Sequence, residues 1–348
     1  MQHFLTTQDW SVAQIEAVLD LADGLKRNPL QQHLRGKSIA LLFLNPSLRT
    51  RTSFELGMQQ LGGSAIVLQP GKDAWSLEFR PGAVMDGEAE EHIAEVAAVL
   101  SRYCDLIALR AFPLFEDWEI DREDAVIRSL AQHAAVPVIN METIVHPCQE
   151  LALMQTLREH LGEVRRRKFL LTWTWHPQPL NTAVANSALL IATRLGMDVT
   201  LLCPEADYRL DEQFESAAHR NAGDSGGSFT VSHDIEAAYD GADVVYAKSW
   251  GALPYYGRPE EEWERRKNYR HFIVDEEKMA LTRQALFSHC LPLRRNVKAT
   301  DAVMEADYCV AIDEAENRLH VQKAVMMTLL GASLEAGVAP VNNRSEAS

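Results

Sequence analysis

Short apolar runs alternate with amphipathic stretches along most of the chain. The apolar runs are rich in Val, Ile, Leu and Phe, which is typical of buried parallel strands. We expect strands at residues 38–44, 65–69, 105–109, 136–139, 169–173, 198–202, 228–232, 243–247, 285–288 and 308–312. Helices are expected at residues 51–61, 90–102, 122–133, 149–161, 182–195, 211–220 and 315–330. This alternation predicts an α/β fold of doubly wound parallel sheets with helices on both faces.

The strands fall into two series, separated by the helix expected at 149–161. A chain of 348 residues is also long enough for about two domains. We therefore expect a first domain at 1–150 and a second at 151–318, with a cleft between them. A helix at 319–336 should pack back on the first domain, and the polar tail at 337–348 should be disordered.

Composition narrows the class of protein. The hydrophobic fraction of 47% is ordinary for a globular protein. The formal net charge of −15 disfavours binding of nucleic acid or anionic membranes, which are held by clustered Lys and Arg. Apolar runs are far shorter than the ~18 residues of a membrane span, and we expect no secretory signal. The five cysteines form no Cys-x-x-Cys pair, so we expect no metal, and no Gly-x-Gly-x-x-Gly follows a strand, so we expect no cofactor. An odd number of cysteines without a secretory signal indicates reduced thiols and a cytoplasmic location.

The segment after the first expected strand concentrates groups that bind anions. Residues 45–52 read NPSLRTRT and lead into a helix, whose N-terminus offers unpaired N–H groups and a partial positive charge. Ser47 and Thr50 add hydroxyls, and Arg49 and Arg51 add guanidinium groups that suit phosphate oxygens. At the carboxyl edge of a parallel sheet this pattern predicts a phosphate site. A capped helix with two surface arginines is the alternative interpretation.

Three motifs, in this order, resemble those of the carbamoyltransferase family. Residues 47–51 (SLRTR) resemble its Ser-x-Arg-Thr-Arg loop for carbamoyl phosphate, and residues 146–149 (HPCQ) its His-Pro-x-Gln signature. Residues 289–292 (HCLP) resemble the His-Cys-Leu-Pro signature of the ornithine-type branch. Arg110 and Arg318 stand where the family has two further anion-binding arginines. The resemblance implies transfer of a carbamoyl group from carbamoyl phosphate to an amine, with release of phosphate.

The resemblance also implies roles for individual residues. Carbamoyl phosphate would be bound by Ser47, Leu48, Arg49, Thr50, Trp75, Arg110, His146, Gln149, Cys290, Leu291 and Arg318. Thr50, Arg110 and His146 would be catalytic, because they polarise the carbonyl oxygen on which negative charge develops. Trp75 would reach the phosphate site of a neighbouring subunit in a homotrimer. Lys298 would carry a carboxyl group, which requires a neutral amine and so a lowered pKa.

The acceptor amine is indicated by stretches outside these motifs. The sequence lacks the Ser-Met-Gly loop that ornithine enzymes use for the α-groups of the amino acid. Residues 69–75, 84–87, 140–143 and 171–177 resemble the branch of the family that acts on N-acetyl-L-ornithine. That branch makes N-acetyl-L-citrulline and phosphate in arginine biosynthesis. The resemblance places the acceptor at Glu142, Lys248 and Leu291. We expect His176, at the carboxyl end of a strand, and Glu90 as further contacts.

Glu90 is the residue that we expect to distinguish between acylated ornithines. Related succinylornithine enzymes often have Pro here; a carboxylate would repel a succinyl carboxylate and tolerate an acetyl methyl. An acidic residue in a first helical turn, favoured by the helix dipole, would explain Glu90 equally well. Two other functions stay open: carbamoyl transfer to ornithine or succinylornithine, and non-catalytic binding of carbamoyl phosphate.

Overall fold

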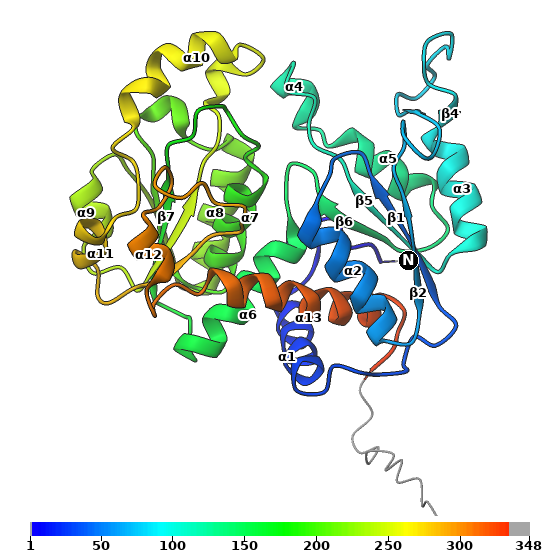
Figure 1. The fold of residues 1–348 in the computed structure, drawn as a ribbon, viewed down its shortest axis with the longest axis horizontal. Helices are drawn as coiled ribbons and strands as arrows, with labels where there is room; N and C mark the ends of the chain where they lie inside the picture. The colour runs from blue at the N-terminus through cyan, green and yellow to red at the C-terminus, as the bar shows by residue number, and fades with distance from the viewer. Residues whose placement is uncertain (1, 334–348) are drawn as a thin grey trace, which may run out of the picture.

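The computed structural model describes residues 2–333. Two parallel sheets form the centres of two lobes, with helices against the faces of each sheet (Figure 1). The expected α/β fold of two parallel-sheet units is therefore confirmed. The tail at 337–348 lies outside the described residues. No helix within the described part is long and apolar enough to cross a membrane.

The first lobe is built on a four-stranded sheet of order β2-β1-β5-β6, in which neighbouring strands run parallel. Its strands are β1 (Ser38–Phe43), β2 (Ser64–Leu68), β5 (Leu106–Arg110) and β6 (Val138–Glu142). The helices α3 (Ile93–Tyr103) and α5 (Ala125–His133) pack together over one apolar cluster that includes Leu42 and Ile107. The central strands are buried on both faces, which explains their continuous apolar sequence.

The second lobe holds a five-stranded parallel sheet of order β11-β10-β7-β8-β9. Its strands are β7 (Lys168–Trp173), β8 (Asp198–Leu202), β9 (Ser228–Ser232), β10 (Val244–Lys248) and β11 (Leu286–Ser288). Its main helices are α7 (Ala183–Arg194), α8 (Glu212–Ser225), α9 (Ile235–Tyr239) and α11 (Glu276–Ala280). Figure 1 shows α9 and α11 on one side of the sheet and α7 and α8 on the other.

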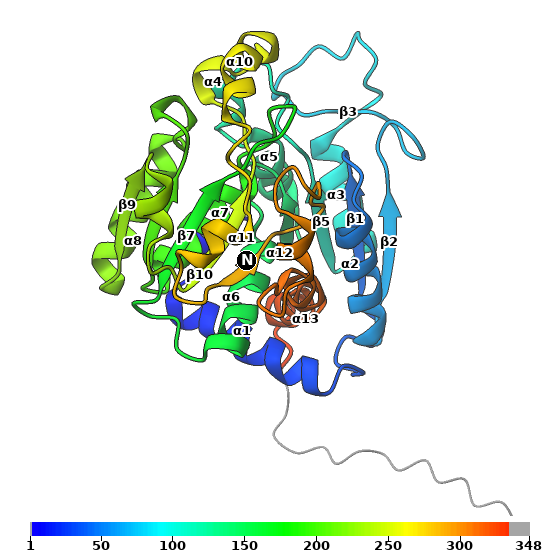
Figure 2. The same cartoon turned by 60° about the vertical axis from the view of Figure 1, so that its left-hand side comes forward.

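Two long helices join the lobes. The helix α6 (Pro147–Leu161) leads from the first sheet to the second, and α13 (Ala311–Leu329) begins near β11 and packs on α1 (Val12–Arg27), α2 (Leu48–Gln60) and α6. Figure 2 shows α13 beside α1 and α6. A Cβ at Gly57 would lie 3.3 Å from Lys323 Cγ, so glycine permits the close approach of α2 and α13. The C-terminal helix therefore returns to the first lobe, as expected.

Short elements complete the described chain. They are β3 (Leu77–Glu78), β4 (Glu91–His92), α4 (Trp118–Asp121), α10 (Pro259–Arg266), α12 (Asp301–Glu305) and 3₁₀ turns at Thr7–Asp9, Ala206–Tyr208, Leu253–Tyr255 and Lys267–Tyr269. The strand predicted at 308–312 is wrong, because Cys309 makes one isolated bridge to Phe287 and α13 begins at Ala311. The helix predicted at 122–133 begins later, after Asp124 in the left-handed region (φ 51°).

Candidate active site

The cleft between the lobes contains a cavity of about 500 Å³ at the carboxyl ends of strands from both sheets. It is lined by Pro46, Ser47, Leu48, Arg49, Thr50, Arg110, Phe112, Glu142, His146, Gln149, Leu180, Asn181, Val184, Lys248, Cys290, Leu291, Pro292 and Arg318. Most of the predicted site residues are in this set, although they come from segments far apart in the sequence. The carboxyl edge of a parallel sheet is where ligands of open α/β folds bind, because loops and helix N-termini gather there.

The predicted phosphate loop forms one wall of the cavity. Ser47 is the N-cap of α2, and its hydroxyl accepts a hydrogen bond from the Thr50 N–H at 3.1 Å. Arg49 is half-buried and faces the cavity; burial is the largest cause that lowers its pKa. Arg51 is exposed and pairs instead with Glu55 at 3.4 Å on the same helix. Thus one of the two arginines in the motif lines the cavity and the other faces solvent.

Arg318 connects the phosphate loop to α6. It is fully buried on α13 and donates to Thr50 Oγ1 at 2.8 Å and to Gln149 Oε1 at 2.6 Å. Burial lowers the pKa of this guanidinium, and the positive charges of Arg110 and Arg49 lower it further. No carboxylate within the described residues forms an ion pair with Arg318 or with Arg49 (distances up to 4.0 Å). These two cations are therefore available to an anion that enters the cavity.

Arg110, Glu142 and His146 form a buried cluster at the ends of β5 and β6. Arg110 Nη1 donates to Glu142 Oε2, and His146 Nε2 lies 3.3 Å from the same oxygen. Burial holds the pKa of His146 well below its usual range, with smaller contributions from Arg318 and Arg110, so the imidazole is neutral near pH 7. Glu142 is the only acidic side chain among the described residues that line the cavity. The wall is thus strongly cationic with a single carboxylate.

The second lobe contributes the end of β10 and the turn after β11. Lys248 is the last residue of β10 and lines the cavity together with Cys290 and Leu291. Leu291 lies in the left-handed region (φ 52°), and its N–H donates to His289 Nδ1 at 2.8 Å. Behind this wall lies Lys298, whose pKa falls to about 7, first because of burial and then because of Lys248.

Four predicted residues do not line the cavity of this chain: Trp75, Glu90, His176 and Lys298. Trp75 is 67% exposed on the loop between β2 and β3, and Glu90 is exposed just before β4. His176 is buried, and its Nδ1 lies 2.8 Å from the Gln178 carbonyl oxygen. Burial is the largest cause that lowers the pKa of His176, to about 4. The roles predicted for these four residues stay predictions.

Sequence reasoning missed four residues of the cavity wall: Phe112, Leu180, Asn181 and Val184. Phe112 packs under the Arg110 guanidinium, 4.6 Å from ring centroid to Cζ. Asn181 holds the Thr143 carbonyl oxygen through its side-chain N–H at 2.7 Å. Both follow a strand at its carboxyl end, and this position is the signal that could have found them.

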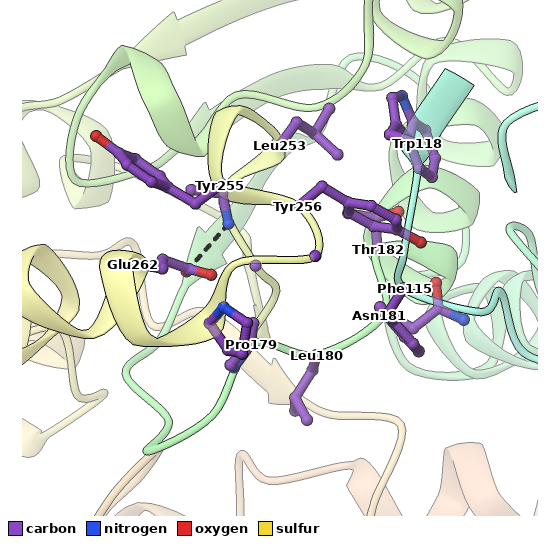
Figure 3. A pocket seen from close by; sticks show the side chains of 14 residues that line it. Phe115, Trp118, Pro179, Leu180, Asn181, Thr182, Leu253, Tyr255, Tyr256 and Glu262 are labelled. Carbon is purple, nitrogen blue, oxygen red and sulfur yellow. Dashed lines mark hydrogen bonds between the residues drawn. The ribbon is translucent and has the colours of Figure 1, made fainter. Parts of the chain in front are cut away.

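A second, mostly apolar cavity adjoins the first and shares Leu180 and Asn181 with it (Figure 3). Its walls come from both lobes: Phe115 stacks on Tyr256 at 5.7 Å, and the Tyr256 hydroxyl donates to Asp121 Oδ2 at 2.8 Å. These contacts connect the loop after β5 to the loop after β10. They hold the lobes together beside the candidate active site.

Comparison with known proteins identifies the family. Residues 2–159 match the carbamoyl-P binding domain of aspartate/ornithine carbamoyltransferases, and residues 172–329 match the Asp/Orn binding domain. N-acetylornithine carbamoyltransferase of Xanthomonas campestris is 67% identical over 96% of this chain and 99% of that protein. N-succinylornithine carbamoyltransferase of Bacteroides fragilis is 36% identical over 85% of this chain and 88% of that protein.

Solved structures agree with these matches. A crystal structure of acetylornithine transcarbamylase complexed with acetylcitrulline superposes with a TM-score of 0.94 at 67% identity, and the match covers 94% of this chain and 99% of the other. Among the sequence relatives, ornithine carbamoyltransferase of Pyrococcus abyssi is less similar than the Xanthomonas protein, at 38% identity over 94% of this chain and 95% of that protein. The chain belongs to the aspartate/ornithine carbamoyltransferase family.

Proposed function

We propose that the protein transfers the carbamoyl group of carbamoyl phosphate to the side-chain amine of N-acetyl-L-ornithine, giving N-acetyl-L-citrulline and phosphate in arginine biosynthesis. The observation that carries the proposal is the cavity in which Arg49, Arg318 and Arg110 meet Lys248 of the other lobe. Relatives that share 64–67% identity with this chain are N-acetylornithine carbamoyltransferases, which supports this acceptor over ornithine.

The phosphate group would be bound at the N-terminus of α2. The first-turn N–H groups, the Ser47 and Thr50 hydroxyls and the Arg49 side chain all face this end of the cavity, and Leu48 contributes its N–H. Arg318 would add a second guanidinium behind Thr50. Because neither arginine pairs with a carboxylate among residues 2–333, a phosphate dianion would supply the counter-charge that they lack.

The carbonyl oxygen would lie between Thr50, Arg110 and His146, where negative charge develops as the amine attacks. The new bond joins the amine nitrogen to the carbonyl carbon, the carbon–oxygen bond to phosphate breaks, and phosphate leaves with the electron pair. The amine must be neutral to attack, and its proton passes to the leaving phosphate or to Glu142. A neutral His146 suits a donor to the oxygen rather than a charged acid.

The carbamoyl amide would be held by Gln149 in the first turn of α6 and by Cys290 and Leu291 of the second lobe. We expect Glu142 to orient the attacking amine and Lys248 to pair with the substrate carboxylate. The Arg110 guanidinium donates to the buried Glu142 carboxylate. Binding of carbamoyl phosphate would therefore redirect Arg110 towards the substrate and leave Glu142 for the amine.

Three elements of the proposal extend beyond one active site. We propose that the protein is a homotrimer in which the exposed Trp75 reaches a neighbouring phosphate site; sedimentation and a Trp75→Ala variant test this. A lowered pKa of about 7 supports carboxylation of the Lys298 amine, which intact mass in bicarbonate buffer tests. A cytoplasmic location is supported by five free cysteines.

Glu90 is proposed to select the acyl group of the acceptor, together with His176 as a further contact. Its carboxylate is exposed and would repel a second carboxylate. Glu90→Ala should raise kcat/KM with succinylornithine, whereas Glu88→Ala, also exposed on the same loop, should not. No gain in the Glu90→Ala protein would contradict the proposal.

The reaction is tested by phosphate release with three acceptors: N-acetylornithine, N-succinylornithine and ornithine. We expect kcat/KM to be at least tenfold higher with N-acetylornithine. Preference for ornithine or succinylornithine would replace the proposed acceptor. No turnover with any of the three would favour a protein that binds carbamoyl phosphate without reacting it.

A further inference from the structure

A buried carboxylate lies directly behind the candidate active site. Glu314, in the first turn of α13, has no exposed surface and lines no cavity described above. Its Oε1 accepts from Gln149 Nε2 and, at 3.0 Å, from the Tyr246 hydroxyl, and its Oε2 accepts from the Ser288 hydroxyl. One carboxylate thus connects α6 with β10 and β11 of the second sheet.

The Gln149 side-chain amide is held at both ends. Arg318 has only donors and binds the amide oxygen at 2.6 Å, while the amide nitrogen can only donate and faces Glu314. A rotation of the amide by 180° would bring N–H groups against the Arg318 guanidinium and an oxygen against the carboxylate. Glu314 and Arg318 therefore fix which atom of Gln149 is the oxygen, whether or not Glu314 carries a proton.

We propose that Glu314 is a positioning residue for carbamoyl phosphate, acting through the orientation of Gln149. The inference rests on the proposed function, in which Gln149 binds the carbamoyl NH₂ group. With its nitrogen bound to Glu314, Gln149 keeps one free lone pair on its oxygen for an N–H of the substrate. Without an acceptor at position 314 only Arg318 still orients the amide, so it is held less tightly and more often presents N–H groups to a substrate that needs an acceptor.

Two substitutions separate this role from a structural one. Glu314→Met removes the acceptor at similar size, and Glu314→Gln keeps an amide oxygen that accepts from Gln149. Loss of one neutral hydrogen bond is worth about 0.5–1.5 kcal/mol, so Glu314→Met should raise the KM for carbamoyl phosphate about two- to twelvefold. The kcat should stay within about twofold, because ground state and transition state use the same contact. Glu314→Gln should restore most of the KM.

Inorganic phosphate is the discriminating probe, because it lacks the carbamoyl NH₂ group. Its inhibition constant should stay within about twofold in Glu314→Met, since the phosphate loop is intact. Ser288→Ala is the matched control: it removes another hydrogen bond to the same carboxylate without touching Gln149, and should leave KM unchanged. If Glu314→Met does not fold, the Tyr246 and Ser288 hydroxyls that it leaves without an acceptor are removed as well, in a triple variant with Tyr246→Phe and Ser288→Ala. The reference for that triple variant is the double variant Tyr246→Phe/Ser288→Ala.

Several results would overturn the inference. These are an unchanged KM in a folded Glu314→Met protein, a phosphate inhibition constant that rises together with KM, and a Glu314→Gln protein as impaired as Glu314→Met. Failure of the proposed function looks different, because the wild-type protein would then form no carbamoylated product.

Discussion

Arg49 offers the sharpest test of the phosphate site. It faces the cavity, has no carboxylate partner up to 4.0 Å within the described residues, and lies near the positive charge of Arg110. Removing such a cation should cost the folded protein little, because no ion pair among the described residues is lost. Arg49→Ala should therefore change the free energy of unfolding by less than about 0.5 kcal/mol, as at other positions without special contacts.

Binding of carbamoyl phosphate should respond quite differently. A hydrogen bond that involves a charged group is worth about 1.5–3 kcal/mol, and about 1.4 kcal/mol corresponds to a factor of ten. Arg49→Ala should thus lower kcat/KM for carbamoyl phosphate by about 10- to 100-fold. Initial rates of phosphate release, with acetylornithine saturating, measure this ratio, and urea unfolding monitors the fold.

Arg51 provides the control on the same helix. Its guanidinium is exposed and pairs with Glu55, an arrangement worth about 0.3–0.5 kcal/mol on a helix surface. Arg51→Ala should leave kcat/KM within about twofold. The reasoning fails if Arg51→Ala is as impaired as Arg49→Ala, or if Arg49→Ala loses activity only because it unfolds.

Three further predictions follow from single contacts and charges. The pKa of Lys298 is about 7 in the folded protein and has its usual value of 10.5 in the unfolded chain. Between pH 7 and 10 the unfolded chain therefore binds this proton more strongly than the folded protein, so the free energy of unfolding should rise with pH in CO₂-free buffer. Urea unfolding at several pH values measures this slope of unfolding free energy against pH, and Lys298→Met should remove the part that comes from Lys298. An identical slope in Lys298→Met would contradict the argument that burial lowers the pKa of Lys298. Tyr256→Phe removes a hydrogen bond to Asp121 between the lobes. The free energy of unfolding should fall by about 1 kcal/mol, which lowers the urea midpoint. An unchanged midpoint would show that this contact does not stabilise the protein. Because burial holds the His146 pKa well below its usual range, kcat/KM should show no inflection from this group between about pH 6 and 8; an inflection near pH 6.5 that disappears in His146→Asn would refute a neutral imidazole.

The parallel sheets could be predicted because their central strands are buried on both faces and read as continuous apolar runs. The same rule failed at residues 308–312, where the apolar segment is only partly buried, pairs through Cys309 alone and then continues into α13. A segment that packs its apolar side chains without pairing has the same local composition as a segment that pairs as a strand. A sequence pattern therefore could not distinguish one isolated bridge from a full strand.

The candidate site was predictable where a motif follows a strand. Ser47, Arg49 and Gln149 are examples, since each lies at the carboxyl edge of the first sheet. Glu314 gave no such signal, because its partners come from three segments that only the fold brings together. Trp75 lies outside the cavity of its own chain, so its proposed role depends on a second copy.

The central claim is that this cavity joins a carbamoyl group to acetylornithine. The most direct test supplies carbamoyl phosphate labelled with carbon-13, together with acetylornithine, and measures the product mass and the phosphate released. The account predicts one labelled N-acetylcitrulline for each phosphate above the rate of spontaneous breakdown. Phosphate release without labelled N-acetylcitrulline, or no release above that rate, would contradict it.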